Sequence, residues 1–344
     1  MLTILLSLFL SLGAHAESGF IKIPAGHELY FDYQKAEAGK PTFVLVNGLV
    51  YQLDRWEKLS RPLQKSGYGV LRYYFRGQLA TLRQELKNGR PAFFTSGLSG
   101  ETFALELSQL MDALKIEKGI VVGLSYGSSI AAEFARLYPK KVEQLVFLAP
   151  LVIPLDRYDA GGAWIHWNLQ ALRLSWGPLF GPYVYDYYYN WIYRSYMGKR
   201  LVPEKIPDEM KDVSEDYKES VFHQVRATRD FDLRAYTFPG LEGRVHLFLA
   251  SEEEAPALKD QFLAWKAFGK SRASLVYFSP SWHAIPDSCG RFAAELLNGV
   301  AKEEARFAPG KIYYASTKNK SLEPVASADA LEQRALAEPR GEKE

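Results

Sequence analysis

The sequence predicts an α/β protein with a mostly parallel, doubly wound sheet. Short apolar runs suited to buried strands alternate along the chain with segments of helical length and spacing. The run at 42–46 is apolar at every position except its first, as in a parallel strand covered on both faces. The run at 119–124 passes without a linker into a helix of small residues. Such strand-to-helix connections are typical of parallel sheets.

Each expected element follows from this alternation. The strands are expected at 20–23, 28–33, 42–46, 69–75, 119–124, 143–149, 244–250 and 274–278. Helices are expected at 54–65, 101–114, 257–268 and 288–301, and one more after the strand at 119–124. The first two strands surround a Pro-Ala-Gly turn and predict a hairpin. Ser99 is the expected N-cap of the helix at 101–114, after a long polar loop.

Changes in composition divide the chain into a core, an insertion and a tail. The core is expected at 17–150 and 241–308. Between its parts, residues 151–240 are too long for an ordinary connection and are rich in Trp and Tyr, which predicts a separate aromatic insertion. Residues 309–344 are expected to be a polar tail, disordered or weakly helical beyond a short docking segment at 311–314.

Composition narrows the function classes. The chain has 344 residues and a formal net charge of +2, so charge gives no argument for a nucleic-acid partner. Cys289 is the single cysteine, which excludes an intrachain disulfide. We expect no metal or other cofactor, because no Cys/His cluster has metal-ligand spacing.

The first sixteen residues predict a signal peptide. An apolar stretch precedes Ala14-His15-Ala16, a small-x-small cleavage pattern, so we expect cleavage after Ala16 and export to the periplasm or outside the cell. The apolar stretch is too short for a transmembrane span. No membrane-spanning segment is therefore expected after cleavage.

A Gly-x-Ser-x-Gly motif lies where the strand at 119–124 becomes a helix, with its serine at Ser125. A residue at such a corner has a strained backbone and an exposed side chain. Larger side chains at Gly123 and Gly127 would collide with the turn. The adjacent helix N-terminus favours negative charge. The motif predicts a serine nucleophile.

From Gly123 to Pro150 the sequence resembles the nucleophile elbow, helix and next strand of the α/β-hydrolase family, with Leu-Tyr-Pro at 137–139 and Val-Phe-Leu-Ala-Pro at 146–150. The resemblance extends over roughly residues 20–305 and implies the α/β-hydrolase fold, with residues 151–240 as a helical cap inserted between the strands at 143–149 and 244–250. It also implies a Ser, acid, His triad in that chain order.

His283 is the expected base of this triad. It follows the last core strand, and the carboxyl end of a parallel sheet opens onto the same crevice as the elbow. The acid is expected in the loop that follows the strand at 244–250, which contains three adjacent carboxylates, Glu252, Glu253 and Glu254. They cannot all be buried beside one imidazole, so one is expected to point inward.

The resemblance places the acid three residues after a small residue at the strand end. Counting from Ser251 gives Glu254, our first choice, and counting from Ala250 gives Glu253, our second. Asp156, after the preceding strand, is a weaker alternative.

Two backbone N–H groups are expected to form an oxyanion hole. One belongs to Tyr126, directly after the nucleophile, and the other to Leu49, with Gly48 permitting close approach. The family commonly has His-Gly where this chain has Asn47-Gly48, which leaves the role of Asn47 open.

The expected activity is hydrolysis of a carboxylic ester with an apolar acyl or alcohol part, because the insertion is aromatic and carries little charge between residues 161 and 193. Trp164, Trp167 and Trp282 are candidate pocket residues. An acyltransferase, a peptidase or a C–C hydrolase with the same triad, or a non-catalytic binding protein of this fold, are the alternatives. The expected partner is a small molecule, and the sequence does not define an oligomeric state.

Overall fold

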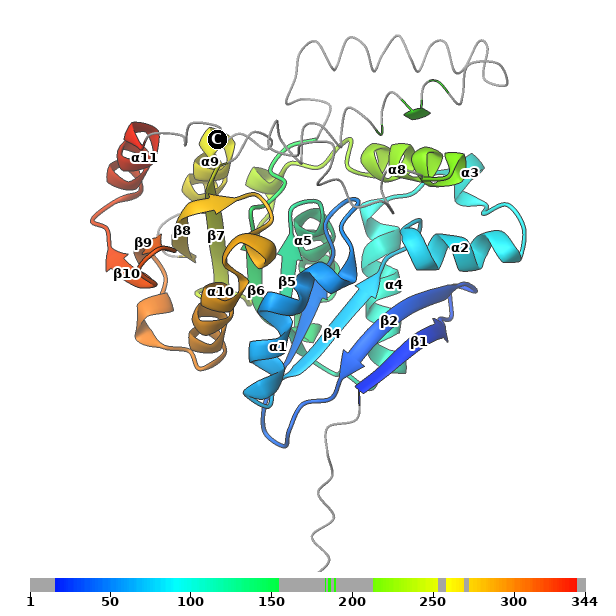
Figure 1. Cartoon of the computed structure of the whole chain (residues 1–344), viewed down its shortest axis with the longest axis horizontal. Coiled ribbons are helices and arrows are strands. Elements are labelled where there is room, and N and C mark those ends of the chain that lie inside the picture. Colours follow the sequence, from blue (N-terminus) through cyan, green and yellow to red (C-terminus); the bar gives the residue numbers. More distant parts are fainter. Residues whose placement is uncertain are drawn as a thin grey trace, which may run out of the picture.

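The computed structural model describes residues 16–154, 183, 185, 186, 189, 213–252, 258–268 and 272–338. The strands in these residues are β1 (Ala16–Lys22), β2 (Glu28–Gln34), β3 (Thr42–Val46), β4 (Gly69–Tyr74), β5 (Gly119–Leu124), β6 (Val142–Leu148), β7 (Val245–Glu252), β8 (Ala273–Trp282), β9 (Ile312–Ser316) and β10 (Ser321–Pro324). They form one ten-stranded sheet in the order β1-β2-β4-β3-β5-β6-β7-β8-β9-β10 (Figure 1).

The sheet is parallel from β4 to β9, and antiparallel pairs occur at its two ends. β3 pairs in parallel with β4 and β5, and β5, β6, β7, β8 and β9 follow in parallel. β1, β2 and β4 pair antiparallel, as do β9 and β10. The predicted α/β class, the mostly parallel sheet and the opening hairpin are confirmed. The carboxyl ends of the parallel strands lie at one edge, where a ligand site is expected.

Helices cover both faces of the sheet. The described α-helices are α1 (Glu57–Lys65), α2 (Leu79–Lys87), α3 (Phe93–Ser96), α4 (Gly100–Ala113), α5 (Gly127–Leu137), α8 (Glu215–Ala227), α9 (Leu258–Phe268), α10 (Ile285–Ala301) and α11 (Ala328–Ala337). Short 3-10 helices are η1 (Leu53–Trp56), η2 (Pro139–Lys141), η5 (Leu233–Ala235) and η6 (Ala305–Phe307). α1 and α10 pack together on one face, and α4, α5 and α9 belong to the core on the other (Figure 1).

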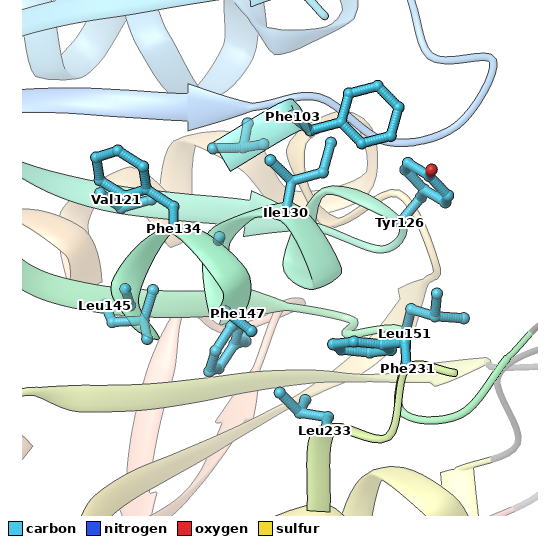
Figure 2. Close-up of a cluster of buried hydrophobic side chains, with 14 of the residues drawn as sticks. Phe103, Val121, Tyr126, Ile130, Phe134, Leu145, Phe147, Leu151, Phe231 and Leu233 are labelled. Carbon is cyan, nitrogen blue, oxygen red and sulfur yellow. The ribbon is translucent and has the colours of Figure 1, made fainter. Parts of the chain in front are cut away.

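The largest buried cluster packs α4 and α5 against the sheet. In Figure 2, Ile130 and Phe134 of α5 lie between Phe103 of α4 and the strands that carry Val121 and Phe147. All five side chains are at most 1% exposed. Burial on this scale is the main stabilising contribution for a sheet that is apolar on both faces. It also fixes α5, the helix that begins directly after Ser125.

Two stretches differ from the expected structure. The expected polar loop between residues 78 and 98 contains α2 and α3. α2 forms because Leu82 and Thr81 bury one side of it against the hairpin, while its other positions stay polar. The N-cap of α4 at Ser99 is confirmed, since its side chain accepts a hydrogen bond from the Thr102 N–H at 3.1 Å.

The docking segment expected at 311–314 lies in β9, and the chain beyond it, expected to be disordered or weakly helical, forms β10 and α11 up to residue 338. β9 pairs with the free edge of β8, β10 turns back on β9, and α11 packs on α9. Buried apolar residues hold the segment in place, among them Ile312, Ala315 and Leu331. Sparse apolar positions are enough here because an uncovered strand edge supplies ready hydrogen-bond partners.

Most of the predicted cap lies outside the described residues. Its last part is described: α8 lies beside α3, at the carboxyl edge of the sheet (Figure 1). Phe231, Leu233 and Phe238, in the part of the chain expected to be cap, belong to the same buried cluster as Phe147 of β6. The Leu233 N–H donates to the Val152 carbonyl at 2.8 Å, which joins this stretch to the end of β6.

Candidate active site

Ser125 occupies a sharp corner between β5 and α5. Its φ is +52°, in the left-handed region that residues with a side chain rarely adopt. Its N–H donates to the Leu148 carbonyl at 2.9 Å, and its own carbonyl accepts from Ser128 at 2.9 Å and Leu151 at 3.1 Å. These bonds hold the strained conformation. Within the described residues the Ser125 Oγ is buried and has no hydrogen-bond partner.

The two glycines of the motif are required by close packing. A Cβ at Gly123 would lie 2.7 Å from the Gly127 carbonyl oxygen and 2.8 Å from the Ser128 Cα. A Cβ at Gly127 would lie 2.3 Å from the carbonyl oxygen of Val46. Both contacts are with backbone, which cannot move aside without displacing β3 or α5. The predicted reason for the two glycines is therefore confirmed.

His283 lies beside Ser125 in one pocket. The last core strand is longer than expected and runs to Trp282, so His283 follows directly, and α10 begins two residues later at Ile285. Ser125, His283, Leu49, Gly48 and Trp282 all line this pocket, with further lining from Val50, Tyr51, Arg55, Leu124 and Ala284. The fold thus brings together residues that are more than two hundred positions apart in the sequence.

The other described histidines lie elsewhere. The His27 Nε2 is 2.7 Å from Glu106, and the His223 Nε2 is 3.9 Å from Glu219. His246, inside β7, is 2% exposed, and burial lowers its pKa to about 3. None of the three lines the pocket that contains Ser125. His283 is thus the candidate base among the described histidines.

Both choices for the triad acid, Glu254 and Glu253, lie outside the described residues, as do Asp156, Trp164 and Trp167. The described structure shows where the acidic loop begins. Glu252 is the last residue of β7 and pairs in register with Trp282, the residue before His283. The loop after Glu252 therefore starts beside the loop that carries the histidine.

A serine pair joins these two loops across an irregular part of the sheet. The pairing of β7 with β8 shifts register between Ala250 and Glu252. There the Ser251 Oγ accepts a hydrogen bond from the Ser281 N–H at 2.9 Å and donates to the Ser281 carbonyl at 3.2 Å. The hydroxyl replaces the backbone bonds that the shift removes. Sequence reasoning missed this role, because serine at a strand end has no distinctive pattern.

The two expected oxyanion donors are placed beside the nucleophile. Leu49 lines the pocket, and Tyr126 follows Ser125 at the start of α5. Neither backbone N–H donates a hydrogen bond to any residue in the described part of the chain. A Cβ at Gly48 would lie 3.4 Å from its nearest described atom, the Leu124 carbonyl oxygen, so packing within the described residues does not by itself require glycine there.

Asn47 has a structural role that the sequence left open. It is completely buried, and its Oδ1 accepts a hydrogen bond from the Trp56 Nε1 at 2.9 Å. Its Nδ2 donates to the Tyr51 carbonyl and, at 3.3 Å, to the Gln78 Oε1. The Gln78 amide also donates to the Gly48 carbonyl at 2.8 Å. The side chain of Asn47 thus fixes the loop that carries Leu49.

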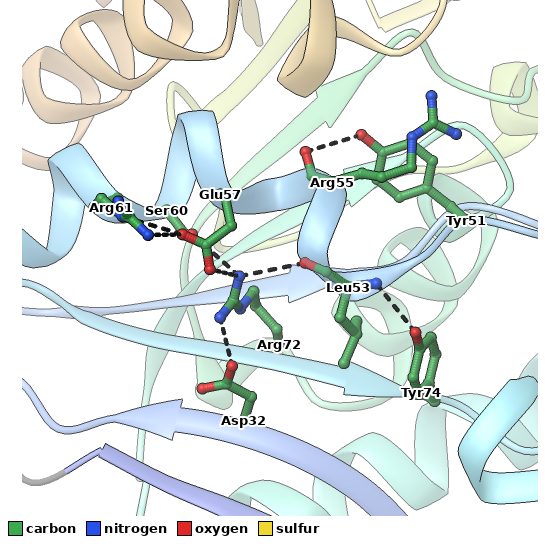
Figure 3. Close-up of polar contacts among 9 residues, drawn as sticks. All are labelled: Asp32, Tyr51, Leu53, Arg55, Glu57, Ser60, Arg61, Arg72 and Tyr74. Carbon is green, nitrogen blue, oxygen red and sulfur yellow. Dashed lines mark hydrogen bonds and ion pairs between the residues drawn. The ribbon is translucent and has the colours of Figure 1, made fainter. Parts of the chain in front are cut away.

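A second polar network anchors the next part of this loop (Figure 3). The Arg72 guanidinium, on β4, donates to the Leu53 carbonyl at 3.3 Å and to Glu57 at 3.0 Å, and it forms an ion pair with Asp32. The Tyr74 hydroxyl accepts from the Leu53 N–H at 3.2 Å. The loop after β3 is therefore held from both sides, which preorganises any donor that it presents.

α8 contacts the residue that follows the nucleophile. The Tyr126 hydroxyl donates to the Gln224 carbonyl at 2.7 Å, and the side chains of Ser220 and Gln224 both donate to the Gly77 carbonyl. The Tyr126 ring stacks on Phe75 with centroids 5.6 Å apart. The residue after the nucleophile is thus clamped between the core and α8.

The described residues contain no group of three or more His, Cys, Asp or Glu side chains arranged to hold a metal ion. Nor does the described part of the chain have a helix that is both long and apolar enough to cross a bilayer.

Comparisons with known proteins agree with this architecture. Residues 41–175 match the family model described as alpha/beta hydrolase fold. Over 120 residues the chain is 31% identical to a protein of Synechocystis sp. that carries the name of a non-heme chloroperoxidase, covering 35% of this chain and 40% of that one. It is 29% identical over 135 residues, 38% of this chain and 44% of the other, to a 2-hydroxy-6-oxononadienedioate/2-hydroxy-6-oxononatrienedioate hydrolase of Paraburkholderia xenovorans.

These matches span less than half the length of either relative. Among solved structures, an esterase from Exiguobacterium antarcticum superposes with a TM-score of 0.58 at 16% identity, covering 83% of this chain and 100% of the esterase. The sheet order, the elbow and these likenesses define an α/β-hydrolase fold. Residues 41–175 resemble the alpha/beta hydrolase family, and the described chain has the fold of that family.

Proposed function

We propose that the protein is a serine hydrolase that cleaves a carboxylic ester through an acyl-enzyme on Ser125. The observation that carries the proposal is the shared pocket of Ser125, His283 and Leu49, with the Ser125 Oγ buried at a strained corner. A buried hydroxyl at such a corner is held ready for attack because the elbow leaves it little freedom to move away.

In the proposed reaction, the Ser125 Oγ attacks the ester carbonyl while His283 removes its proton. The N–H groups of Leu49 and Tyr126 then hold the oxyanion of the tetrahedral intermediate. His283 returns the proton to the departing alcohol, which leaves the acyl group on Ser125. Water, deprotonated by His283, attacks the acyl-enzyme, and the acid is released as His283 returns that proton to the Ser125 Oγ.

The third member of the triad is Glu254, with Glu253 as second choice. Its carboxylate would orient the imidazole of His283 and stabilise the imidazolium. The support for this assignment is that the acidic loop begins at Glu252, which pairs with Trp282 beside His283. The bond between Ser251 and Ser281 keeps the two loop origins together.

The proposed substrate is a small ester whose acyl or alcohol part is largely apolar. Leu49, Val50, Leu124, Trp282 and Ala284 give the described pocket a mainly apolar lining. Trp164 and Trp167 remain candidate pocket residues from the cap. We also propose that the mature protein is exported after cleavage behind Ala16, which N-terminal sequencing of protein recovered from the extracytoplasmic fraction would test.

A panel of p-nitrophenyl esters of increasing acyl length tests the activity. Wild-type protein should hydrolyse part of the panel, and Ser125→Ala and His283→Ala should each lower kcat by roughly four orders of magnitude. Adding alcohol and amine acceptors distinguishes acyl transfer from hydrolysis by its products. Peptide and β-diketone substrates test peptidase and C–C hydrolase activity. A wild-type protein inactive on all of them would favour a binding protein.

A further inference from the structure

Arg55 is a charged side chain in an otherwise largely apolar pocket. It lines the same pocket as Ser125 and His283, and its side chain is 17% exposed. A guanidinium stays protonated at every physiological pH, so the charge is permanent. Burying such a charge beside Leu49 and Trp282 is costly unless the charge is paired.

The guanidinium is held in place from two sides. It lies over the Tyr51 ring, 4.6 Å from the centroid, and it is 6.0 Å from the centroid of Trp282. Its Nη2 forms an ion pair with Asp287, near the start of α10. In Figure 3, the Arg55 side chain lies alongside the Tyr51 ring, and the Tyr51 hydroxyl donates to the Arg55 carbonyl at 3.4 Å. Stacking and the ion pair together restrict the rotation of the side chain.

Asp287 does not use all the donors of this group. A guanidinium has five N–H donors in a planar fork, suited to two-point contact with a carboxylate. In the described part of the chain, Nη2 is the one nitrogen of the Arg55 guanidinium that has a polar partner. A fixed fork with remaining donors, placed in a pocket beside the nucleophile, fits an anionic oxygen pair on a ligand.

We infer that Arg55 forms a subsite for a carboxylate on the acyl part of the substrate. This inference rests on the proposed function and narrows its substrate class to half-esters of dicarboxylic acids with a short apolar spacer. A neutral acyl chain would cover the guanidinium of Arg55 without offering its N–H groups a hydrogen-bond acceptor. Sites built to bind a polar group discriminate strongly against analogues that lack it.

Matched ester pairs test the inference. Mono-p-nitrophenyl succinate, glutarate and adipate are compared with p-nitrophenyl butyrate, valerate and hexanoate, which have a methyl group in place of the carboxylate. At one or more chain lengths, the kcat/KM of the wild type should be about tenfold or more higher for the acid ester than for its neutral counterpart. Arg55→Met should reduce this acid-to-neutral ratio at least tenfold. Arg55→Lys, which keeps the charge without the fork, should restore only part of it.

Two controls separate an effect of the Arg55 charge from an effect on folding. Arg61, exposed on α1 and paired with Glu57, provides the matched variant Arg61→Met, which should leave the acid-to-neutral ratio unchanged. Added salt should reduce the acid preference of wild type more than that of Arg55→Met. A wild-type ratio that favours the neutral ester at every length, or a ratio that Arg55→Met does not change, would overturn the inference.

Binding of glutarate gives a readout that needs no catalysis. Glutarate should raise the Tm of the wild type and of Ser125→Ala, but not that of Arg55→Met. If no ester is hydrolysed yet glutarate binds through Arg55, the serine hydrolase proposal fails and the subsite stands. If esters are hydrolysed without regard to charge and glutarate does not bind, the subsite fails and the hydrolase proposal stands.

Discussion

The hydroxyl of Ser251 bridges both backbone groups of Ser281, accepting from its N–H at 2.9 Å and donating to its carbonyl at 3.2 Å. Ser251 lies one residue before the acidic loop, and Ser281 lies two residues before His283. The pair therefore sets the separation of the two loops from which the proposed triad takes its acid and its base.

Ser251→Ala should lower kcat by about tenfold with little change in KM, because His283 loses its fixed position while the pocket lining stays the same. It should also destabilise the fold by about 1–3 kcal/mol, since the N–H and carbonyl of Ser281 lose their partner. Steady-state kinetics and urea unfolding measure the two effects.

Ser274→Ala is the matched control for Ser251→Ala. It breaks a buried hydrogen bond between the same two strands, the 2.8 Å contact between the Ser274 Oγ and the His246 Nδ1. This contact lies at the amino-terminal ends of β7 and β8, away from Ser251. Its stability loss should be similar, with kcat close to that of wild type. An equal fall of kcat in both variants would mean that Ser251 acts on stability alone.

Asn47→Ala should destabilise the protein and reduce activity together. The Trp56 indole N–H and the Tyr51 carbonyl would be left buried without their partner, at about 1–3 kcal/mol for each group. The loop that presents Leu49 would loosen, so kcat should fall even at temperatures where the variant is fully folded. Unfolding curves with kcat from the same samples check both effects. A variant with the unfolding midpoint of the wild type would contradict the assigned role.

The two glycines near the site should respond differently to alanine. Gly127→Ala places a methyl group 2.3 Å from the Val46 carbonyl oxygen, which forces α5 away from β3. The overpacking should cost about 3 kcal/mol or more. Gly48→Ala meets its nearest described atom at 3.4 Å and should change the unfolding free energy by less than about 1 kcal/mol. Similar losses of unfolding free energy in the two variants would show that the closer packing at Gly127 does not determine the cost of the substitution.

His246 should make stability fall at acid pH. Its Nδ1 and Nε2 contact Ser274 and Gln144 at 2.8 Å, and burial lowers its pKa to about 3. In the unfolded chain the pKa of this histidine is about 6.5. Between the two pKa values the unfolded chain therefore binds a proton that the folded chain does not bind. The stabilisation is therefore complete above about pH 6.5 and declines toward pH 3 as the unfolded state takes up the proton.

The test of His246 is the free energy of unfolding measured from pH 7 to pH 4 for wild type and His246→Gln. The glutamine variant should start lower at pH 7 but should lose less stability as the pH falls. Parallel curves for the two proteins would exclude His246 as a source of the pH dependence.

The sequence predicted the central strands well because the sheet buries them on both faces and leaves apolar runs such as that of β3. It predicted only a short docking segment at 311–314 and missed β9 and β10 as strands. Tyr313 and Tyr314 are adjacent and both half-buried, and their strand depends on a β8 edge that only the tertiary structure defines. Ser125 and His283 could be chosen from motif and chain order. The roles of Asn47, Ser251 and Arg55 could not, because no motif or hydrophobic period in the sequence signals their side-chain contacts.

Labelling by a fluorophosphonate probe, with the adduct located by mass spectrometry, tests whether Ser125 is the nucleophile. Wild-type protein should give one phosphonylated peptide, modified at Ser125, with no labelling of Ser125→Ala or of wild type unfolded before the probe is added. An adduct on another residue, or folded wild-type protein that does not react, would contradict the assignment of Ser125 as the nucleophile.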